Sequence, residues 1–189
     1  MNIIFLDIDG VMLPFRNHQR IKADLDALRI EVAQKFNDEA FLTMNKFDIG
    51  AFCLDFQPES VDYLKRLIKE FDAKIVFSTG WRYMGYETLL KLFKILDLDQ
   101  YIIGETPRYE NIDITQYDYI FDQDIPFMFN YYRVVEILEY VKTHDVDNYV
   151  ALDDMDLSYL GNHFIYIEDG YFDKEHYKQA YKQFKSATK

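Results

Sequence analysis

The chain begins with MNIIFLDIDGV (residues 1–11), a short apolar segment that stops abruptly at an acidic pair. Asn2–Leu6 has the length and composition of a buried strand, and the motif DIDG (residues 7–10) follows it directly. Open α/β sheets place their ligand sites where the carboxyl ends of the strands emerge. Two carboxylates at such an end, followed by a glycine that permits a sharp turn, suit a divalent cation or a carboxylate nucleophile with a neighbouring acid/base. Taken alone, DIDG fits a solvated Asp-Gly turn after an edge strand equally well.

Length and composition limit the class of protein. A chain of 189 residues is long enough for one domain with a sizeable core, or for one domain that carries a small insertion. Its residues are 49% hydrophobic and 29% charged, which argues against disorder. The formal net charge of −12 argues against extended, sequence-independent nucleic-acid binding, because such binding relies on Lys and Arg to neutralise phosphates.

The cysteine count and the hydropathy of the chain favour a cytoplasmic protein. Cys53 is the only cysteine, so no internal disulfide can form and a reducing compartment is favoured. The N-terminal apolar run lacks a basic start and is broken by Asp7, unlike a signal peptide. The sequence has no run of about 18 apolar residues that would span a membrane, so no membrane partner is expected. Oligomeric state does not follow from the sequence.

Along the chain, apolar strand-like runs alternate with amphipathic helical patterns. The predicted strands are Asn2–Leu6, Lys74–Phe77, Tyr101–Gly104, Asn148–Leu152 and Phe164–Ile167. Helical periodicity predicts helices over Ile21–Phe36, Pro58–Phe71, Tyr86–Leu96, Phe129–Lys142 and Lys174–Phe184. Alternating strands and helices imply right-handed crossovers, so we predict an α/β fold with a mainly parallel, Rossmann-like sheet flanked by helices.

Two segments interrupt this alternation within a predicted single domain over residues 1–189. Residues 12–56 follow the first strand and are predicted to form a lid or cap. Basic side chains near its start either reach an anionic substrate or belong to a solvated helix entry; they are Arg16, His18, Arg20 and Lys22. Residues 108–128 are acidic and aromatic and predict a second small insertion, in which we expect Asp122 and Asp124 to be solvated.

Small or acidic residues follow three of the predicted strands at the point where each strand ends. They are Asp7 with Asp9, the run Ser78-Thr79-Gly80, and the pair Asp153-Asp154. In a parallel sheet these ends meet at one edge, where close carboxylates repel each other by roughly 4 kcal/mol per pair at an effective dielectric constant of about 20. Mg²⁺ prefers oxygen ligands and would relieve this repulsion, so the sequence predicts a magnesium site at this edge.

The order of these motifs carries a family resemblance. DIDGV (7–11), an apolar strand ending in Ser78, and ALDD (151–154) together resemble the haloacid dehalogenase-like (HAD) superfamily of phosphatases and phosphotransferases. With STGWR (78–82) and GETP (104–107) added, the pattern is similar to the small HAD-like phosphatase domains found beside RNA-repair enzymes. The resemblance implies a Rossmann-like HAD core with a small cap after the first strand.

The resemblance also implies a role for each matching residue. Asp7 would be the nucleophile that forms an aspartyl-phosphate. Asp9 would be the general acid/base that protonates the leaving oxygen and then activates water. Ser78 would donate a hydrogen bond to a phosphate oxygen, with the backbone amides of Thr79 and Gly80 close behind.

The implied metal ligands and cation complete this set. Asp154, together with Asp153, would hold Mg²⁺ along with the Asp7 carboxylate and the Asp9 carbonyl. The family places a Lys, less often an Arg, near the start of the helix before the last acidic strand. Arg133 is the residue that matches this position here.

Three neighbouring residues have two candidate roles each. Arg82 would contact either phosphate or the lid carboxylates. Trp81 would either pack in the core or stack on the substrate. Asp156 would either orient Arg133 or be solvated.

Together these inferences predict a Mg²⁺-dependent phosphomonoester hydrolase, a HAD-type phosphatase. The substrate would be a small phosphate ester, a nucleotide or a phosphorylated nucleic-acid end, held without an extended nucleic-acid footprint. Two alternatives stay open: a phosphotransferase or mutase of the same superfamily, which excludes water from the aspartyl-phosphate, and a catalytically silent binding or regulatory module. The complete set of Asp7, Asp9, Ser78 and Asp154 argues against the silent module.

Overall fold

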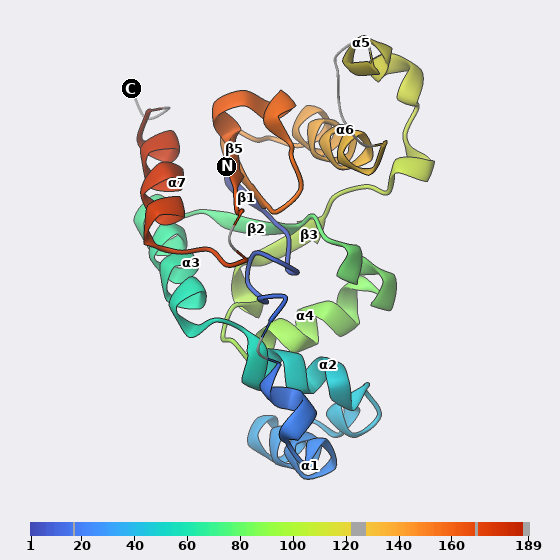
Figure 1. The fold of residues 1–189 in the computed structure, drawn as a ribbon. Coiled ribbons are helices and arrows are strands. Elements are labelled where there is room, and N and C mark those ends of the chain that lie inside the picture. The colour runs from blue at the N-terminus through green and yellow to red at the C-terminus, as the bar shows by residue number, and fades with distance from the viewer. Residues whose placement is uncertain (17, 122–127, 169, 187–189) are drawn as a thin grey trace.

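A computed structural model describes residues 1–16, 18–121, 128–168 and 170–186 of the chain. At its centre lies a five-stranded parallel sheet with the strand order β3-β2-β1-β4-β5 (Figure 1). The strands are β1 (Asn2–Leu6), β2 (Lys74–Phe77), β3 (Ile102–Glu105), β4 (Asn148–Asp153) and β5 (Phe164–Tyr166). The predicted parallel α/β fold is confirmed, and no strand end differs from its prediction by more than one residue.

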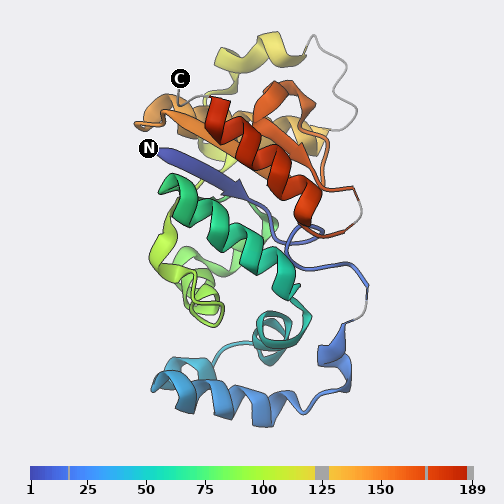
Figure 2. The same cartoon turned by 90° about the vertical axis from the view of Figure 1, so that its left-hand side faces the viewer.

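One face of the sheet is covered by three helices. Ile4 and Leu6 of β1 belong to the larger hydrophobic core, into which α3 (Pro58–Phe71), α4 (Tyr86–Lys94) and α7 (Lys174–Ser186) all contribute buried side chains. Helices α3 and α7 lie side by side, as Figures 1 and 2 both show. Pro58 occupies the first turn of α3 as predicted, because its missing N–H has no helical partner to lose at that position.

The opposite face of the sheet is covered chiefly by α6 (Met128–Thr143). Ile3 and Phe5 point to this face, since successive residues of a strand alternate between the two sides of a sheet. They form a second core with apolar side chains of α6, and the Phe5 ring meets Tyr140 edge-on at a centroid distance of 5.5 Å. The sheet is therefore buried on both faces, which explains the nearly continuous apolar run of β1.

Residues between β1 and α3 form a helical group that packs on the larger hydrophobic core. It comprises the 3-10 helices Gln19–Lys22 and Glu39–Leu42, α1 (Leu25–Phe36), α2 (Lys46–Gly50) and a π-helical turn, Ala51–Asp55. Figure 1 shows α1 and α2 at the end of the molecule opposite α5 and α6. The lid role of this group stays a prediction.

The predicted helix Ile21–Phe36 is wrong in its first turn. Ile21 belongs to the preceding 3-10 helix and is 75% exposed. Helix α1 begins only at Leu25, because the Asp24 carboxylate accepts hydrogen bonds from two amides of its first turn. An N-cap of this kind ends the preceding segment and starts a new helix. The predicted end at Phe36 is confirmed.

The second predicted insertion also consists of short helical segments. They are the 3-10 helices Tyr109–Asn111 and Ile114–Tyr117, followed by α5 (Asp118–Phe121). Asp122 and Asp124 lie outside the described residues. Three further 3-10 helices occur elsewhere, at Gly80–Met84, Asp99–Tyr101 and Ser158–His163.

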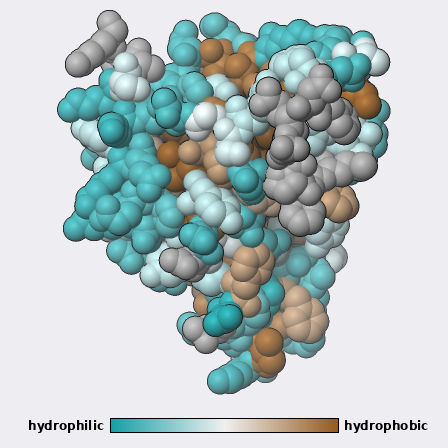
Figure 3. Space-filling model, turned by 45° about the horizontal axis from the view of Figure 1, so that its top comes forward, coloured by the Kyte–Doolittle hydropathy of each residue, from teal (hydrophilic) through white to brown (hydrophobic). Residues whose placement is uncertain are grey.

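The surface agrees with the charged composition of the chain. Hydrophilic residues cover most of the face shown in Figure 3, with hydrophobic patches between them. Among the helices that the structure describes, none combines the length and the apolar character needed to cross a membrane.

Candidate active site

The register of the sheet brings three strand ends together. The Asp7 amide donates to a β4 carbonyl at 3.0 Å, and the Ser78 amide donates to a β1 carbonyl at 3.0 Å. Asp7, Ser78 and Asp153 therefore lie side by side at the carboxyl edge of the sheet. Carboxylate oxygens of Asp7, Asp153 and Asp154 all lie within 4.8 Å of one another. We call these three residues the acidic cluster.

The acidic cluster carries negative charge that the protein compensates only in part. Burial, followed by the negative charge of Asp7, raises the pKa of Asp154 to about 6. Burial also raises the pKa of Asp153, against the lowering effect of the Arg133 guanidinium. Such shifts arise when carboxylates crowd together in a poorly solvated place. The donor set consists of carboxylate oxygens, the ligand type that Mg²⁺ prefers, so the residues present fit the predicted cation.

Arg133 of α6 is the cation that contacts the acidic cluster. Its Nη1 donates to Asp153 Oδ2 at 2.8 Å and to the Ser78 carbonyl, and lies 3.4 Å from Asp7 Oδ1. Burial alone would lower the pKa of Arg133, but the surrounding carboxylates, Asp153 foremost, raise it, so the guanidinium stays charged. Arg133 thus contacts the ends of three strands, and its role as the family's cation stays a prediction.

The carboxylates of the cluster differ in their freedom to bind a metal ion. Asp153 uses Oδ2 for Arg133 and accepts the Met155 amide on Oδ1 at 2.9 Å. Asp154 makes no hydrogen bond to another residue in the described part of the chain. Asp7 and Asp154 therefore have carboxylate oxygens available for a cation, whereas Asp153 is already engaged on both sides.

Asp9 lies outside the acidic cluster and has a partner of its own. Its Oδ2 accepts a hydrogen bond from Trp81 Nε1 at 2.7 Å. Burial raises the pKa of Asp9; the Trp81 hydrogen bond lowers it, and the negative charge of Asp7 raises it. A carboxyl with a raised pKa holds its proton at higher pH, which suits a proton donor.

The turn after Asp9 requires glycine at position 10. Gly10 has φ +71°, and a Cβ atom there would lie 2.6 Å from Asp154 Oδ2 and 2.8 Å from Phe15 Cε2. The Ile8 carbonyl accepts hydrogen bonds from the amides of Val11, Met12 and Leu13, which closes the loop tightly. DIDG is therefore a close-packed turn against the acidic cluster, not a solvated turn after an edge strand, since β1 is the central strand.

Ser78 and Thr79 follow β2, and their hydroxyl groups make different contacts. Thr79 Oγ1 accepts the Trp81 amide at 3.3 Å and thereby caps the 3-10 helix Gly80–Met84. Ser78 Oγ is buried and has no hydrogen-bond partner in the described residues. A buried hydroxyl without a partner is costly, and a bound ligand oxygen would satisfy it. The side of Gly80 where a Cβ would project is open space.

Arg82 is engaged away from the acidic cluster. Its Nε donates to the Thr79 carbonyl at 2.7 Å, and its Nη1 donates to the carbonyl and hydroxyl of Thr106 at 2.8 and 2.6 Å. Its Nη2 pairs with Glu136 Oε2 at 2.7 Å, and both side chains are buried. Every guanidinium nitrogen of Arg82 thus has a protein partner, after β2, after β3 or in α6, and none of these partners lies in the lid. The contact of Arg82 with substrate stays a prediction.

The basic residues of the predicted lid divide into paired and unpaired groups. Arg20 Nε lies 3.1 Å and His18 Nδ1 3.4 Å from Oδ2 of the buried Asp55. Arg16 and Lys22 are exposed, and neither has a hydrogen-bond or ion-pair partner among the described residues. Asp156 is exposed as well, and its carboxylate accepts the Ser158 amide at 2.9 Å and does not contact Arg133.

Sequence reasoning missed two contacts of this site. The first is the hydrogen bond from Trp81 to Asp9. The two predicted roles of Trp81, packing in the core and stacking on the substrate, do not include it. The second is Glu136, whose side chain pairs with Arg82. The sequence does contain an indication of this pairing. Glu136 stands between the apolar residues Val135 and Ile137, three residues after Arg133. A glutamate buried on a helix must be paired with a cation.

Comparison with known proteins identifies a family for most of the chain. Residues 3–175 match the family described as "HAD domain in Swiss Army Knife RNA repair proteins". No protein of curated function and no solved structure matches the chain. The matched segment runs from β1 into the first turn of α7 and includes the whole acidic cluster together with Asp9, Ser78 and Arg133. The chain therefore belongs to the family of HAD domains in Swiss Army Knife RNA repair proteins, a branch of the HAD hydrolase superfamily.

Proposed function

We propose that the protein is a Mg²⁺-dependent phosphomonoesterase that works through an aspartyl-phosphate on Asp7. The observation that carries the proposal is the meeting of three groups at one edge of the sheet. The Asp7 carboxylate lies 3.4 Å from the Arg133 guanidinium, and the unpartnered hydroxyl of Ser78 belongs to the adjacent strand end. A phosphoryl group placed there meets a nucleophile, a cation and a hydrogen-bond donor at once.

In the first half-reaction, an Asp7 oxygen attacks the phosphorus while the ester P–O bond breaks and its electron pair leaves with the ester oxygen. Asp9 donates its proton to that oxygen, so the alcohol leaves in neutral form. The raised pKa of Asp9 favours this protonated state. The Ser78 hydroxyl and the Arg133 guanidinium stabilise the phosphoryl oxygens during transfer.

In the second half-reaction, Asp9 acts in its ionised form. It takes a proton from water as the water oxygen attacks the phosphorus of the aspartyl-phosphate. The bond between phosphorus and the Asp7 oxygen then breaks, which releases inorganic phosphate and restores the carboxylate. The Trp81 hydrogen bond at 2.7 Å holds the Asp9 carboxylate in place for both steps.

Mg²⁺ would be held by the carboxylates of Asp7 and Asp154, with Asp153 and the Asp9 carbonyl as the other predicted ligands. When bound, the ion neutralises negative charge on the phosphoryl group and on the acidic cluster. The pKa of Asp154, raised to about 6 by burial and by Asp7, supports a cation at this place.

The proposed substrate is a small phosphate ester, a nucleotide or the phosphorylated end of a nucleic acid. The formal net charge of −12 supports a short footprint, because a long one would need many Lys and Arg contacts to phosphate. The proposed partner is therefore the phosphorylated group itself and not an extended duplex or strand.

The test is steady phosphate release from p-nitrophenyl phosphate with and without Mg²⁺. Asp7→Asn should lower the rate by about 10³-fold or more, because it removes the nucleophile. Asp156→Asn is the matched control, since this exposed aspartate lies close in sequence to the cluster yet does not contact Arg133, and it should leave the rate unchanged. Phosphoryl transfer only to an added acceptor would identify a phosphotransferase. A folded protein that turns over no phosphate ester would identify a binding module.

A further inference from the structure

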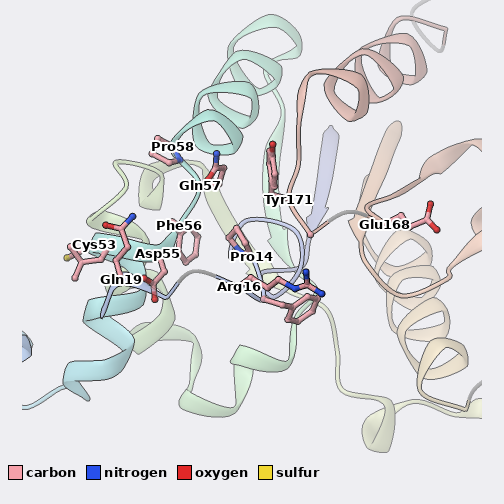
Figure 4. Close-up of a pocket in the computed structure, with 13 residues that line it drawn as sticks. Pro14, Arg16, Gln19, Cys53, Asp55, Phe56, Gln57, Pro58, Glu168 and Tyr171 are labelled. Carbon is pink, nitrogen blue, oxygen red and sulfur yellow. The ribbon is translucent and has the colours of Figure 1, made fainter. Parts of the chain in front are cut away.

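A pocket of about 680 Å³ is lined in part by Phe15, and we name it the Phe15 pocket. Three segments line it: Pro14–Arg16 with Gln19, Cys53–Pro58, and Glu168 with Gly170 and Tyr171. Figure 4 shows Arg16, Gln57 and Tyr171 around this space, each from a different segment. The volume falls in the range of about 300–1,000 Å³ that is typical of small-molecule sites.

The walls of the Phe15 pocket are hydrogen-bonded to the loop that follows DIDG. The Met12 carbonyl accepts the Gln57 amide at 3.0 Å, which joins the second wall to this loop. The Val11 carbonyl accepts the Phe172 amide at 2.7 Å, which joins the third wall to it. The pocket is therefore built around the same loop that positions Asp9.

The first wall reaches the acidic cluster through Gly10. An added Cβ on Gly10 would lie 2.8 Å from Phe15 Cε2 and 2.6 Å from Asp154 Oδ2. The Phe15 ring and the Asp154 carboxylate thus pack against the same glycine. A group attached to a phosphate at the acidic cluster has the Phe15 pocket as its immediate neighbour.

The lining of the pocket offers unused recognition groups. Phe15 is 61% exposed although it is a large apolar ring beside a polar site. Arg16 is the only cation in the described lining, and it has no ion-pair or hydrogen-bond partner among the residues that the structure describes. The carboxamides of Gln19 and Gln57 and the hydroxyl of Tyr171 likewise have no hydrogen-bond partner among the described residues.

These groups match a planar, polar ring attached to an anion. Exposed aromatic rings stack on nucleobases whatever their sequence. Carboxamides donate and accept together, as the edges of nucleobases require. A guanidinium suits phosphate or sugar oxygens. A sugar phosphate has no planar ring to stack on Phe15, and an acyl chain would leave the polar groups unpaired.

We propose that the Phe15 pocket binds the nucleoside of a phosphorylated nucleotide, with the Phe15 ring as the stacking surface and Arg16 as an anion contact. The inference rests on the proposed function only for the place of the phosphate. The nucleotide is either a free mononucleotide or the end of a strand, because both present the same base, sugar and phosphate.

The test is calorimetric binding to the full-length Asp7→Asn protein in the presence of Mg²⁺, so that no turnover is needed. The ligands are adenosine 5′-monophosphate, adenosine 3′-monophosphate and ribose 5-phosphate. The tighter-bound adenosine monophosphate should bind about ten-fold more tightly than ribose 5-phosphate. Adding Phe15→Ala should erase this difference, and adding Arg16→Gln should weaken nucleotide binding about ten-fold.

Two control variants remove comparable side chains outside the pocket. Phe47→Ala removes a ring of α2 that is 54% exposed, and Lys69→Gln removes an exposed cation of α3; both should leave the affinities unchanged. Equal affinity for ribose 5-phosphate and the nucleotides, or a preference that survives Phe15→Ala, would overturn the proposal. A phosphorylated tetranucleotide that binds more tightly, with a steep salt dependence, identifies a strand end; equal affinity identifies a mononucleotide.

The outcome is separable from that of the proposed function. Hydrolysis of acetyl phosphate by the unmodified protein tests the phosphatase alone, because this substrate carries no base. Phe15-dependent nucleotide binding without any hydrolysis would retain the pocket assignment and reject the phosphatase. Hydrolysis of acetyl phosphate without a preference for nucleotides would retain the phosphatase and reject the pocket assignment.

Discussion

Removal of the Glu136 carboxylate should destabilise the fold far more than removal of an exposed carboxylate. Glu136 lies 2.7 Å from Arg82, and the two side chains are only 9% and 10% exposed. The other Glu136 oxygen accepts the Tyr109 amide at 3.0 Å. Arg82 in turn holds the Thr79 carbonyl, so the pair joins α6 to the loop after β2.

The magnitude follows from burial of both partners. Loss of one partner from a buried ion pair costs about 3–5 kcal/mol, because the remaining charge stays buried and unpaired. We therefore expect Glu136→Ala to lower the free energy of unfolding by about 4 kcal/mol, a large part of the roughly 5–15 kcal/mol typical of a domain. Glu136→Gln keeps the shape and a neutral acceptor, and should cost about 2 kcal/mol.

Urea unfolding, followed by circular dichroism, measures these differences through the midpoint and the slope. Glu175→Ala is the matched control, because Glu175 pairs with Lys178 at 2.6 Å but the side chains are 68% and 56% exposed. This exposed pair should contribute less than about 1 kcal/mol. A Glu136→Ala protein that loses no more stability than Glu175→Ala would refute the reasoning.

Three more predictions follow from the geometry of the site and of the lid. Trp81→Phe removes the hydrogen bond that lowers the pKa of Asp9, so the pKa of Asp9 should rise. With an alkyl phosphate substrate, the basic limb of the pH–rate profile, where Asp9 loses its proton, should move to higher pH; an unmoved limb would argue against Asp9 as the donor. Gly10→Ala should lower the free energy of unfolding by about 1–2 kcal/mol for the left-handed backbone alone, with a further loss from the contact with Asp154, and equal urea midpoints would contradict the turn geometry. Burial raises the pKa of Cys53 to about 11, so at pH 8 its alkylation by iodoacetamide should be about 100-fold slower than that of an ordinary cysteine; a rate equal to that of free cysteine would show that the thiol is not buried.

The sheet and half of the site were predictable because their signals are local. The sequence shows where two of the strands end, because one apolar run stops at Asp7 and another stops at Ser78. Parallel pairing then requires these ends to meet, and the register confirms that they do. The cation was predictable only through the resemblance, since Arg133 is far from Asp153 in sequence and the α6 packing brings them together.

The remaining contacts of the site could not be predicted, because they depend on tertiary packing that is not visible in any local sequence pattern. Trp81 looks like any core aromatic until its indole N–H is seen against Asp9. The sequence predicts that Arg82 contacts phosphate or the lid carboxylates, and only the structure shows Glu136 and Thr106 around its guanidinium. The predicted start of α1 at Ile21 was wrong for a different reason. Asp24 caps a new helix, which therefore begins at Leu25 although the apolar periodicity extends further back.

The central claim is that Asp7 carries a covalent phosphoryl group that Asp9 helps water to remove. The most direct measurement uses Asp9→Asn protein with p-nitrophenyl phosphate, whose leaving group needs little protonation. The account predicts a burst of one equivalent of p-nitrophenol, slow turnover afterwards, and a phosphoryl group on the acid-quenched peptide that contains Asp7. Turnover equal to that of the unmodified protein, or a phosphoryl group on any other residue, would contradict it.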